Sequence, residues 1–191
     1  AEKLGLEQEQ ILAGLSNIKS QPGRMNKLDG VNGSVIIDDT YNSSPEAVKA
    51  ALKYLYTCEG VKIALLGNMN ELGSTSQKEH IEIGELCDPS FLSLVVTLGL
   101  DANRYTASTA QQKGCKVIKA DTPYEAGEII KEFVNKSQSS VTVLCKGSQN
   151  GVYAEEAVKI LLNNDKDSQY LVRQSDSWLQ KKRNAFQKAS V

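Results

Sequence analysis

Residues 36–46 read Ile-Ile-Asp-Asp-Thr-Tyr-Asn-Ser-Ser-Pro-Glu, and this stretch decides the fold class. Two apolar β-branched residues favour a strand that runs into a pair of carboxylates and a polar turn. Ser44 then matches an N-cap and Pro45 the first position of a helix. Apolar residues recur at helical spacing as far as residue 55, so one face of this helix is predicted to pack. The pattern places polar groups at the carboxyl end of a strand, where open α/β sheets bind their ligands.

Apolar runs of strand length and amphipathic helical patterns then alternate along most of the chain. The runs are rich in β-branched residues and cover residues 61–66, 94–98, 116–120 and 141–145. Capping boxes, which satisfy free amides at the start of a helix, match residues 76–79 and 122–125. Near-continuous apolar strands separated by amphipathic helices predict a largely parallel sheet covered on both sides. We therefore expect an α/β fold: a Rossmann-like three-layer domain with a mostly parallel sheet and helices on both faces.

The two ends of the chain depart from this alternation. A helix is expected over residues 1–15, followed by a Pro-Gly turn and by a hairpin with strands at 24–28 and 34–39. Beyond the last apolar run, we expect a helix that continues to Leu162. A polar loop, an edge strand and a closing helix are then predicted, in the order 163–168, 170–172 and 175–188.

The composition excludes several classes of protein. The 191 residues, 40% of them hydrophobic and 24% charged, fit one globular domain. A formal net charge of -1 provides no general attraction for nucleic acid or an anionic membrane, and no apolar run is long enough to span a bilayer. The basic residues of the closing helix, Lys181, Lys182, Arg183 and Lys188, are interpreted as a solvated face. The four cysteines form no metal-binding pattern, and a cytosolic protein with small, buried free thiols is the simplest interpretation.

Polar residues gather near the ends of the predicted strands. Asp38 and Asp39 alternate across a strand, so they face opposite sides of the sheet and cannot act as a close acid–base pair. A carboxylate here either binds ribose hydroxyls, as in dinucleotide folds, or complements a helix dipole or is simply solvated. Lys146 and Ser148 follow the last inner strand, where they either bind a carboxylate or phosphate or form an exposed turn. His80 is the only histidine, and a packing or capping role is favoured over a zinc site or a catalytic triad.

The loop at residues 67–73 reads Gly-Asn-Met-Asn-Glu-Leu-Gly and follows a predicted inner strand. It lacks the Gly-Lys-Ser/Thr ending of a phosphate-binding loop, and no other segment of the chain has this ending. A strand-to-helix turn is therefore the favoured interpretation, and this chain cannot grip ATP in the P-loop manner.

Taken in order, the motifs resemble the C-terminal domain of the Mur ligases. The resemblance rests on Gly-Arg-Met at 23–25, Asp-Asp-Thr-Tyr-Asn-Ser-Ser-Pro at 38–45, the loop at 66–73, Glu-His at 79–80 with Gly84, and Lys-Gly-Ser at 146–148. It covers nearly all of the chain. Two positions depart from the family pattern: Ser44 stands where the family more often has Asn, and Asn68 where it more often has Asp. The roles of these two side chains stay open.

The resemblance implies a three-domain, ATP-dependent ligase of which this chain holds only the last domain. Residues 1–22 are then a remnant of the central ATP-binding domain with its linker, and residues 23–191 are the C-terminal Rossmann-like domain, which partners the other two domains. In the implied cytoplasmic reaction, which serves peptidoglycan precursor synthesis, ATP phosphorylates a UDP-N-acetylmuramoyl-tripeptide and the amine of D-alanyl-D-alanine attacks the acyl phosphate. ATP and Mg²⁺ are expected to be held mainly by the absent central domain, so the isolated chain is expected to be inactive.

Carried over residue by residue, the resemblance implies nucleotide contacts for three residues and substrate contacts for two. Arg24 is expected to reach the ATP ribose or phosphates, Asp39 the ribose and Asn42 the adenine side. Lys146 and Ser148 are expected to lie near the incoming dipeptide. No catalytic residue and no metal ligand is implied within this chain. Two alternatives remain open: a sister Mur ligase that adds another amino acid, and a stand-alone Rossmann-like module that binds a nucleotide or a protein.

Overall fold

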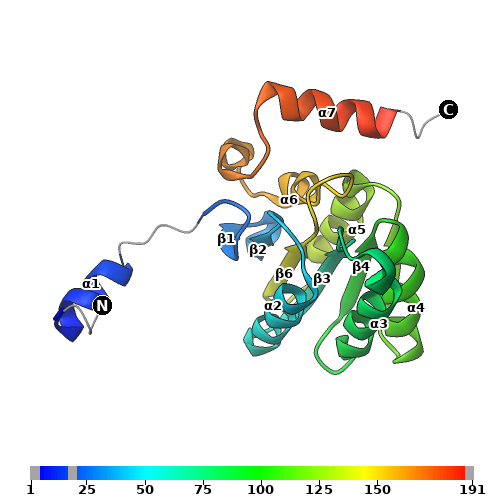
Figure 1. Ribbon diagram of the computed structural model, residues 1–191, viewed down its shortest axis with the longest axis horizontal. Helices are drawn as coiled ribbons and strands as arrows, with labels where there is room; N and C mark the ends of the chain where they lie inside the picture. The colour runs from blue at the N-terminus through cyan, green and yellow to red at the C-terminus, as the bar shows by residue number, and fades with distance from the viewer. Residues whose placement is uncertain (1–4, 17–20, 188–191) are drawn as a thin grey trace.

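The computed structural model describes residues 5–16 and 21–187, and its six strands form one sheet in the order β1-β2-β6-β3-β4-β5 (Figure 1). β1 pairs antiparallel with β2, and every other pair of neighbours is parallel, so the predicted fold class is confirmed. The strands are β1 (Asn26–Asp29), β2 (Val35–Asp39), β3 (Val61–Gly67), β4 (Leu94–Leu98), β5 (Val117–Ala120) and β6 (Val141–Lys146). The helices are α1 (Gln8–Ser16), α2 (Pro45–Thr57), α3 (Ser76–Leu86), α4 (Ala107–Gln112), α5 (Pro123–Lys136), α6 (Glu155–Leu161) and α7 (Asp176–Gln187). Further helical turns, of 3₁₀ or π type, are η2 (Val31–Gly33), η3 (Gly73–Thr75), η4 (Ala102–Thr106) and η5 (Asp165–Tyr170).

Helices cover both faces of the sheet, which makes three layers (Figure 1). α2, α3 and α4 pack on one face, around a hydrophobic cluster that includes Ile37, Leu52 and Ile83. α5 and α6 pack on the opposite face, around a second cluster that includes Ile36 and Ile130. Neighbouring residues of β2 therefore enter different layers, as the two-residue repeat of a strand requires.

The carboxyl edge of the sheet contains a topological switch point. The chain leaves β2 for α2 on one face, whereas it leaves the neighbouring strand β6 for α6 on the other face. Loops that part in this way leave a crevice at the strand ends, where open α/β sheets bind ligands. Four of the five predicted site residues lie at the ends of these strands or in the loops that follow them: Asp39, Asn42, Lys146 and Ser148. The fifth, Arg24, lies in the segment before β1.

The two helices that begin with proline have the N-caps that the sequence predicts. Ser44 Oγ accepts a hydrogen bond from the amide of Ala47 at 3.4 Å, and Pro45 occupies the first turn of α2. Thr122 Oγ1 accepts from the amide of Glu125 at 3.1 Å at the start of α5. Each cap satisfies an amide that the helix itself leaves unpaired.

The capping box predicted at residues 76–79 is wrong. Thr75 has helical backbone angles because the 3₁₀ turn η3 runs directly into α3, so no extended N-cap residue precedes the helix. Ser76 Oγ donates instead to Asp101 Oδ2 at 2.6 Å. The start of α3 is thus tied to the loop after β4 rather than to its own first turn.

The predictions for the two ends of the chain are corrected in part. The first helix begins at Gln8, and residues 1–4 lie outside the described residues. The 3₁₀ turn η5 begins within the predicted polar loop and extends to Tyr170, the first residue of the predicted edge strand. No strand forms at residues 170–172, because Leu171 is buried in the cluster beside α5 and α6 instead of pairing at a sheet edge. Lys188, predicted in the closing helix, also lies outside the described residues.

Candidate functional site

Lys146 lies at the centre of the carboxyl edge, on the strand between β2 and β3. It is in register with Asp39 on one side and with Leu66 on the other. Its side chain is only 2% exposed, so its ammonium group must find partners within the protein. Nζ donates to Asp39 Oδ2 at 2.6 Å and to the carbonyl oxygen of Asn42 at 3.0 Å. The structure therefore brings together three of the predicted site residues: Asp39, Asn42 and Lys146.

Arg24 and Asp39 line one cavity of about 370 Å³, which α2 also borders through residues that include Tyr54. Asp39 Oδ1 accepts from the amide of Met25 at 3.2 Å, so this carboxylate holds the segment that carries Arg24. The guanidinium carbon of Arg24 lies 4.3 Å from the centre of the Tyr41 ring. A cation over an aromatic face is attracted by the ring quadrupole, which steadies both side chains beside the cavity.

Asp38 points away from Asp39 and is fully buried. Its carboxylate accepts from the amide of Gly23 at 3.1 Å, the amide of Thr40 at 3.2 Å and the hydroxyl of Thr40 at 2.6 Å. Burial raises the pKa of Asp38, and the hydrogen bonds from Thr40 and Gly23 oppose that rise. The side chain thus holds the linker and the turn in place and has no open face for a ligand.

Ser148 is buried beneath the same turn. Its hydroxyl donates to the carbonyl oxygen of Ser43 at 3.2 Å and accepts from the amide of Asn70 at 2.9 Å. Ser43 is only 4% exposed, and its Oγ is the one buried side-chain polar atom in the described chain without a hydrogen-bond partner. Such an atom can serve a ligand, because its desolvation is otherwise uncompensated. Ser43 is not among the residues predicted from the sequence; its only sequence signal is its place between the carboxylates and the N-cap.

The loop after β3 is held by two side chains. His80 Nε2 accepts from the amide of Met69 at 3.1 Å, which leaves Nδ1 to donate to the carbonyl oxygen of Ser76 at 2.8 Å. His80 is 1% exposed, so the packing or capping role predicted for the lone histidine is confirmed. Asn68 Oδ1 accepts from the amide of Ala102 at 2.8 Å. An aspartate would supply the same acceptor, so the departure at this position preserves the contact, as the serine N-cap of α2 does at the other.

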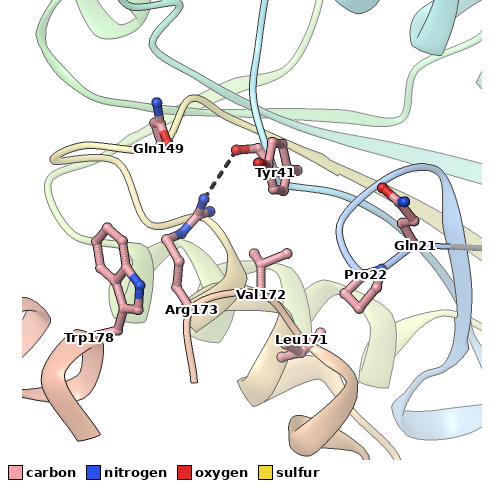
Figure 2. A pocket seen from close by; sticks show the side chains of 8 residues that line it. All are labelled: Gln21, Pro22, Tyr41, Gln149, Leu171, Val172, Arg173 and Trp178. Atoms are coloured by element: carbon pink, nitrogen blue, oxygen red, sulfur yellow. Dashed lines mark hydrogen bonds between the residues drawn. The ribbon is translucent and has the colours of Figure 1, made fainter. Parts of the chain in front are cut away.

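A larger cavity, of about 590 Å³, lies beside Tyr41 (Figure 2). Its walls come from residues 21–22, Tyr41, Gln149, residues 171–173 and Trp178. Figure 2 shows Arg173 reaching to the carbonyl oxygen of Tyr41, with Trp178 on the side of α7. Sequence reasoning missed the contribution of Arg173 and Trp178, because neither belongs to a periodic pattern or a motif.

The closing helix is not a uniformly solvated basic face, so that prediction is wrong for one residue. Lys182 is 1% exposed, whereas Lys181 and Arg183 are exposed. Lys182 Nζ donates to Glu156 Oε1 at 2.6 Å and lies 2.8 Å from Glu155 Oε1. The periodic pattern could not reveal this because both acidic partners lie on α6.

Three of the cysteines are the buried filler that the sequence predicts, and one is not. Cys87, Cys115 and Cys145 are buried, and burial raises the pKa of the Cys87 thiol to about 12. Cys58 is half-buried, and its thiol donates to the carbonyl oxygen of Tyr54 at 3.6 Å.

Over residues 5–16 and 21–187, no group of three or more His, Cys, Asp or Glu side chains is arranged to hold a metal ion. No helix over the same residues is long and apolar enough to cross a membrane.

Residues 23–149 match the family model described as Mur ligase, glutamate ligase domain. The match runs from the linker glycine to the loop after β6, and it contains all five predicted site residues. Arg24, Asp39 and Asn42 lie near its start, and Lys146 and Ser148 near its end. The contacts among these residues therefore join the two ends of the matched segment.

Among curated proteins, the chain is similar to several UDP-N-acetylmuramoyl-tripeptide–D-alanyl-D-alanine ligases. The relative from Escherichia coli (strain K12) is 29% identical over 161 residues, which are 84% of this chain and 34% of that protein. The relative from Bacillus subtilis (strain 168) is 30% identical over 163 residues, 84% of this chain and 35% of that protein. The chain thus spans about a third of the length of these relatives.

Solved structures lead to the same group of enzymes. A crystal structure of MurF from Acinetobacter baumannii superimposes with a TM-score of 0.69 and 26% identity, covering 81% of this chain and 34% of that one. The MurF ligase from Thermotoga maritima in complex with ADP gives a TM-score of 0.66 and 28% identity, covering 87% of this chain and 35% of that one.

Proposed function

The chain belongs to the Mur ligase family through its glutamate ligase domain, and from this premise we propose that it closes over the nucleotide and the amine substrate of an ATP-dependent ligase. The proposed reaction joins D-alanyl-D-alanine to a UDP-N-acetylmuramoyl-tripeptide in peptidoglycan precursor synthesis. The names of the relatives and their length support this choice, since the chain spans about a third of them. Residues 1–22 belong to the preceding domain and its linker in this proposal, and the family match that begins at residue 23 supports that boundary.

One observation carries the nucleotide half of the proposal: Arg24 and Asp39 line the same cavity beside the turn that carries Asn42. A guanidinium, a carboxylate and an exposed amide suit a phosphate or ribose, a ribose hydroxyl pair and an adenine edge respectively. Asp39 Oδ1 accepts from the Met25 amide, and Oδ2 accepts from Lys146 Nζ. A ribose hydroxyl that binds this carboxylate would therefore add to hydrogen bonds that already orient it. The ADP complex of a structural neighbour is consistent with a nucleotide at this domain.

The amine half of the proposal involves Lys146, Ser148 and Ser43. Lys146 and Ser148 are buried and paired, so direct contact with the dipeptide requires their hydrogen bonds to be exchanged. Ser43 has no hydrogen bond to exchange, but its hydroxyl is buried, so contact with the dipeptide requires the turn to open. We nevertheless add Ser43 to the proposed substrate contacts, beside Lys146 and Ser148.

ATP, when bound, supplies the phosphoryl group that activates the peptide carboxylate for attack by the amine. The part of this chain is to bind the ribose and phosphates, to orient the amine and to exclude water when the domains close. In this proposal Mg²⁺ is held mainly by the preceding ATP-binding domain, as the family resemblance implies. A cytoplasmic location is part of the same proposal, because ATP and a UDP-linked precursor are the proposed substrates.

The nucleotide role of Asp39 is tested in the full-length ligase with Asp39→Ala. We expect the KM for ATP to rise by about tenfold or more, because a ribose contact and the support of the Arg24 segment are lost together. Asp29→Ala, which removes an exposed carboxylate from the neighbouring strand β1, is the matched control and should leave the KM unchanged. An unaltered ATP dependence in Asp39→Ala would remove this residue from the site.

The choice of amine is tested by measuring phosphate release from ATP and the UDP-linked tripeptide with a panel of amines. D-alanyl-D-alanine should give the highest kcat/KM, and the isolated 191-residue chain should give no turnover. Preference for another amino acid would favour a sister ligase. Turnover by the isolated chain would overturn the division of roles between the domains.

A further inference from the structure

The turn after β2 is held by its backbone carbonyls, three of which accept hydrogen bonds from buried cations. Arg173 Nη2 donates to the carbonyl oxygen of Thr40 at 2.6 Å, and Arg173 Nη1 donates to that of Tyr41 at 3.1 Å (Figure 2). Lys146 Nζ donates to the carbonyl oxygen of Asn42 at 3.0 Å. Three successive residues of the turn are therefore fixed through their main chain, which leaves the side chains of Tyr41 and Asn42 exposed.

Arg173 is itself fixed by a buried ionic network. Its Nε and Nη2 donate to Glu155 Oε1 and Oε2 at 2.8 and 2.7 Å, a two-point contact that orients the planar guanidinium. Glu155 is 0% exposed, and it also lies 2.8 Å from Lys182 Nζ of α7. Lys182 completes the network by donating to the carbonyl oxygen of Arg173 at 2.9 Å and to Glu156.

Attaching α7 through this network costs desolvation free energy, because four charged side chains are buried. Each buried charge loses its hydration, and well-packed apolar residues often provide equal or greater stability. Arg173 also has a φ of +56°, a left-handed conformation that is unfavourable for a residue with a side chain. What apolar packing cannot supply is geometry: a guanidinium can engage one carboxylate at two points and two carbonyls at once, and a lysine ammonium cannot span the same set.

We propose that Arg173 is a positioning residue for the turn at residues 40–42, and that Lys182 on α7 holds it in register. The inference rests on the proposed function, in which Asn42 and the neighbouring Asp39 face the nucleotide. Because Glu155 lies between the two cations, the position of α7 is coupled to the position of the turn. Residues 155–187 lie outside the segment that matches the family model, so this coupling is a property of the described C-terminal segment.

Arg173→Lys in the full-length ligase separates this role from simple stability. The variant keeps a cation beside Glu155, so the fold is retained, but it loses the simultaneous contact with the carbonyls of Thr40 and Tyr41. We expect the KM for ATP to rise about tenfold, which corresponds to about 1.4 kcal/mol, with kcat and the KM for the amine within about twofold of wild type. The matched control is Arg183→Lys, the same substitution on the exposed face of α7, which should leave all three constants unchanged.

A second variant, Lys182→Met, tests the part played by α7. It removes the donor to the Arg173 carbonyl while Arg173 itself stays, so the KM for ATP should rise by a smaller factor, about threefold. Equal losses of kcat and of folded protein with an unchanged KM would mean that Arg173 is only structural, and would overturn the inference. An unchanged KM for ATP in Arg173→Lys, beside a raised one in Asp39→Ala, would overturn it while leaving the proposed function intact. Failure of wild type to bind ATP in a calorimetric titration would overturn both.

Discussion

Single residues carry much of the electrostatic cost of this domain, and the buried lysine at its carboxyl edge is the clearest case. Lys146 Nζ donates hydrogen bonds to the carboxylate of Asp39, whose side chain is 13% exposed, and to the carbonyl oxygen of Asn42. A buried cation adds little stability compared with an apolar residue, yet its removal leaves its partners desolvated and unpaired. Loss of the cation should therefore lower the free energy of unfolding considerably, even though the intact ion pair adds little to it.

We predict that Lys146→Met lowers the free energy of unfolding by about 3–5 kcal/mol, because it strands the Asp39 carboxylate. The matched control is Lys136→Met on α5. Lys136 pairs with Glu132 one turn away, and both side chains are about 70% exposed, so its loss should cost no more than about 0.5 kcal/mol. Urea unfolding of the two variants measures the difference. Equal effects would show that the ion pair at the carboxyl edge is as solvated as the pair on α5.

Asp38 gives the domain a pH dependence whose sign follows from burial. Its folded pKa is raised above the ordinary value of 3.8, so the folded state binds the proton more tightly than the unfolded chain. Between the unfolded pKa and the raised folded pKa, stability attributable to Asp38 therefore falls as pH rises. Asp38→Asn does not titrate at this position. The stability of wild type relative to Asp38→Asn should thus decrease as pH rises from about 4, measured by urea unfolding at a series of pH values. An increase would mean that the hydrogen bonds from Gly23 and Thr40 outweigh burial.

At the scale of elements, the linker packs against the turn through a glycine. Gly23 has a φ of +68°, its carbonyl oxygen accepts from the amide of Tyr41, and a Cβ there would lie 2.8 Å from that amide nitrogen. The backbone of the linker therefore approaches the backbone of the turn more closely than a side chain permits. This contact places Arg24 over the Tyr41 ring.

Gly23→Ala and Gly33→Ala separate backbone strain from close approach. Both glycines have a φ of +68°, so both variants should lose about 1–2 kcal/mol from the left-handed conformation. A Cβ at Gly33 meets nothing within 4 Å, whereas at Gly23 it meets Tyr41 and Val172. Gly23→Ala should therefore cost a further 1–3 kcal/mol or so of overpacking, measured by thermal unfolding. Equal losses would imply that the linker moves away from the turn freely.

At the scale of the whole molecule, the domain consists of a continuous three-layer core and one peripheral helix. No residue of α7 belongs to either hydrophobic cluster of the described chain. It is attached by Lys182 and by edge-to-face aromatic contacts of Trp178 and Phe186 with Tyr153. Figure 1 shows this helix lying beyond α6, away from the sheet. Elements with few buried apolar contacts open at lower free energy than the core.

Trp178 is the only tryptophan, so its fluorescence reports on α7 alone. We predict that its urea transition in this chain has a lower midpoint than the far-UV circular dichroism transition of the sheet and inner helices. Two midpoints would show that α7 detaches before the core unfolds. Coincident transitions would mean that the ionic network makes α7 part of the cooperative unit.

Local patterns accounted for most of the fold. Strands β3 to β6 lie at the predicted runs to within one residue at each end. The three inner ones, β3, β4 and β6, are apolar and rich in β-branched residues because a parallel strand inside the sheet is buried on both faces. The predictions failed where helical geometry or burial was set by distant segments. No capping box forms at Ser76 because a 3₁₀ turn precedes it directly, and Leu171 packs in the core instead of pairing at a sheet edge.

The sequence by itself determined the layers, the start of α2 and the separation of Asp38 from Asp39, because these follow from periods of 3.6 and 2 residues along the chain. Only the tertiary structure decided which groups meet at the carboxyl edge. Lys146 reaches Asp39 across 107 positions, and Arg173 reaches Tyr41 across 132. No local pattern encodes such a pairing, because it depends on the order of strands in the sheet and on which face each crossover packs. The turn at residues 40–42 before α2 was predictable from the sequence, whereas its hydrogen bonds from Lys146 and Arg173 were not.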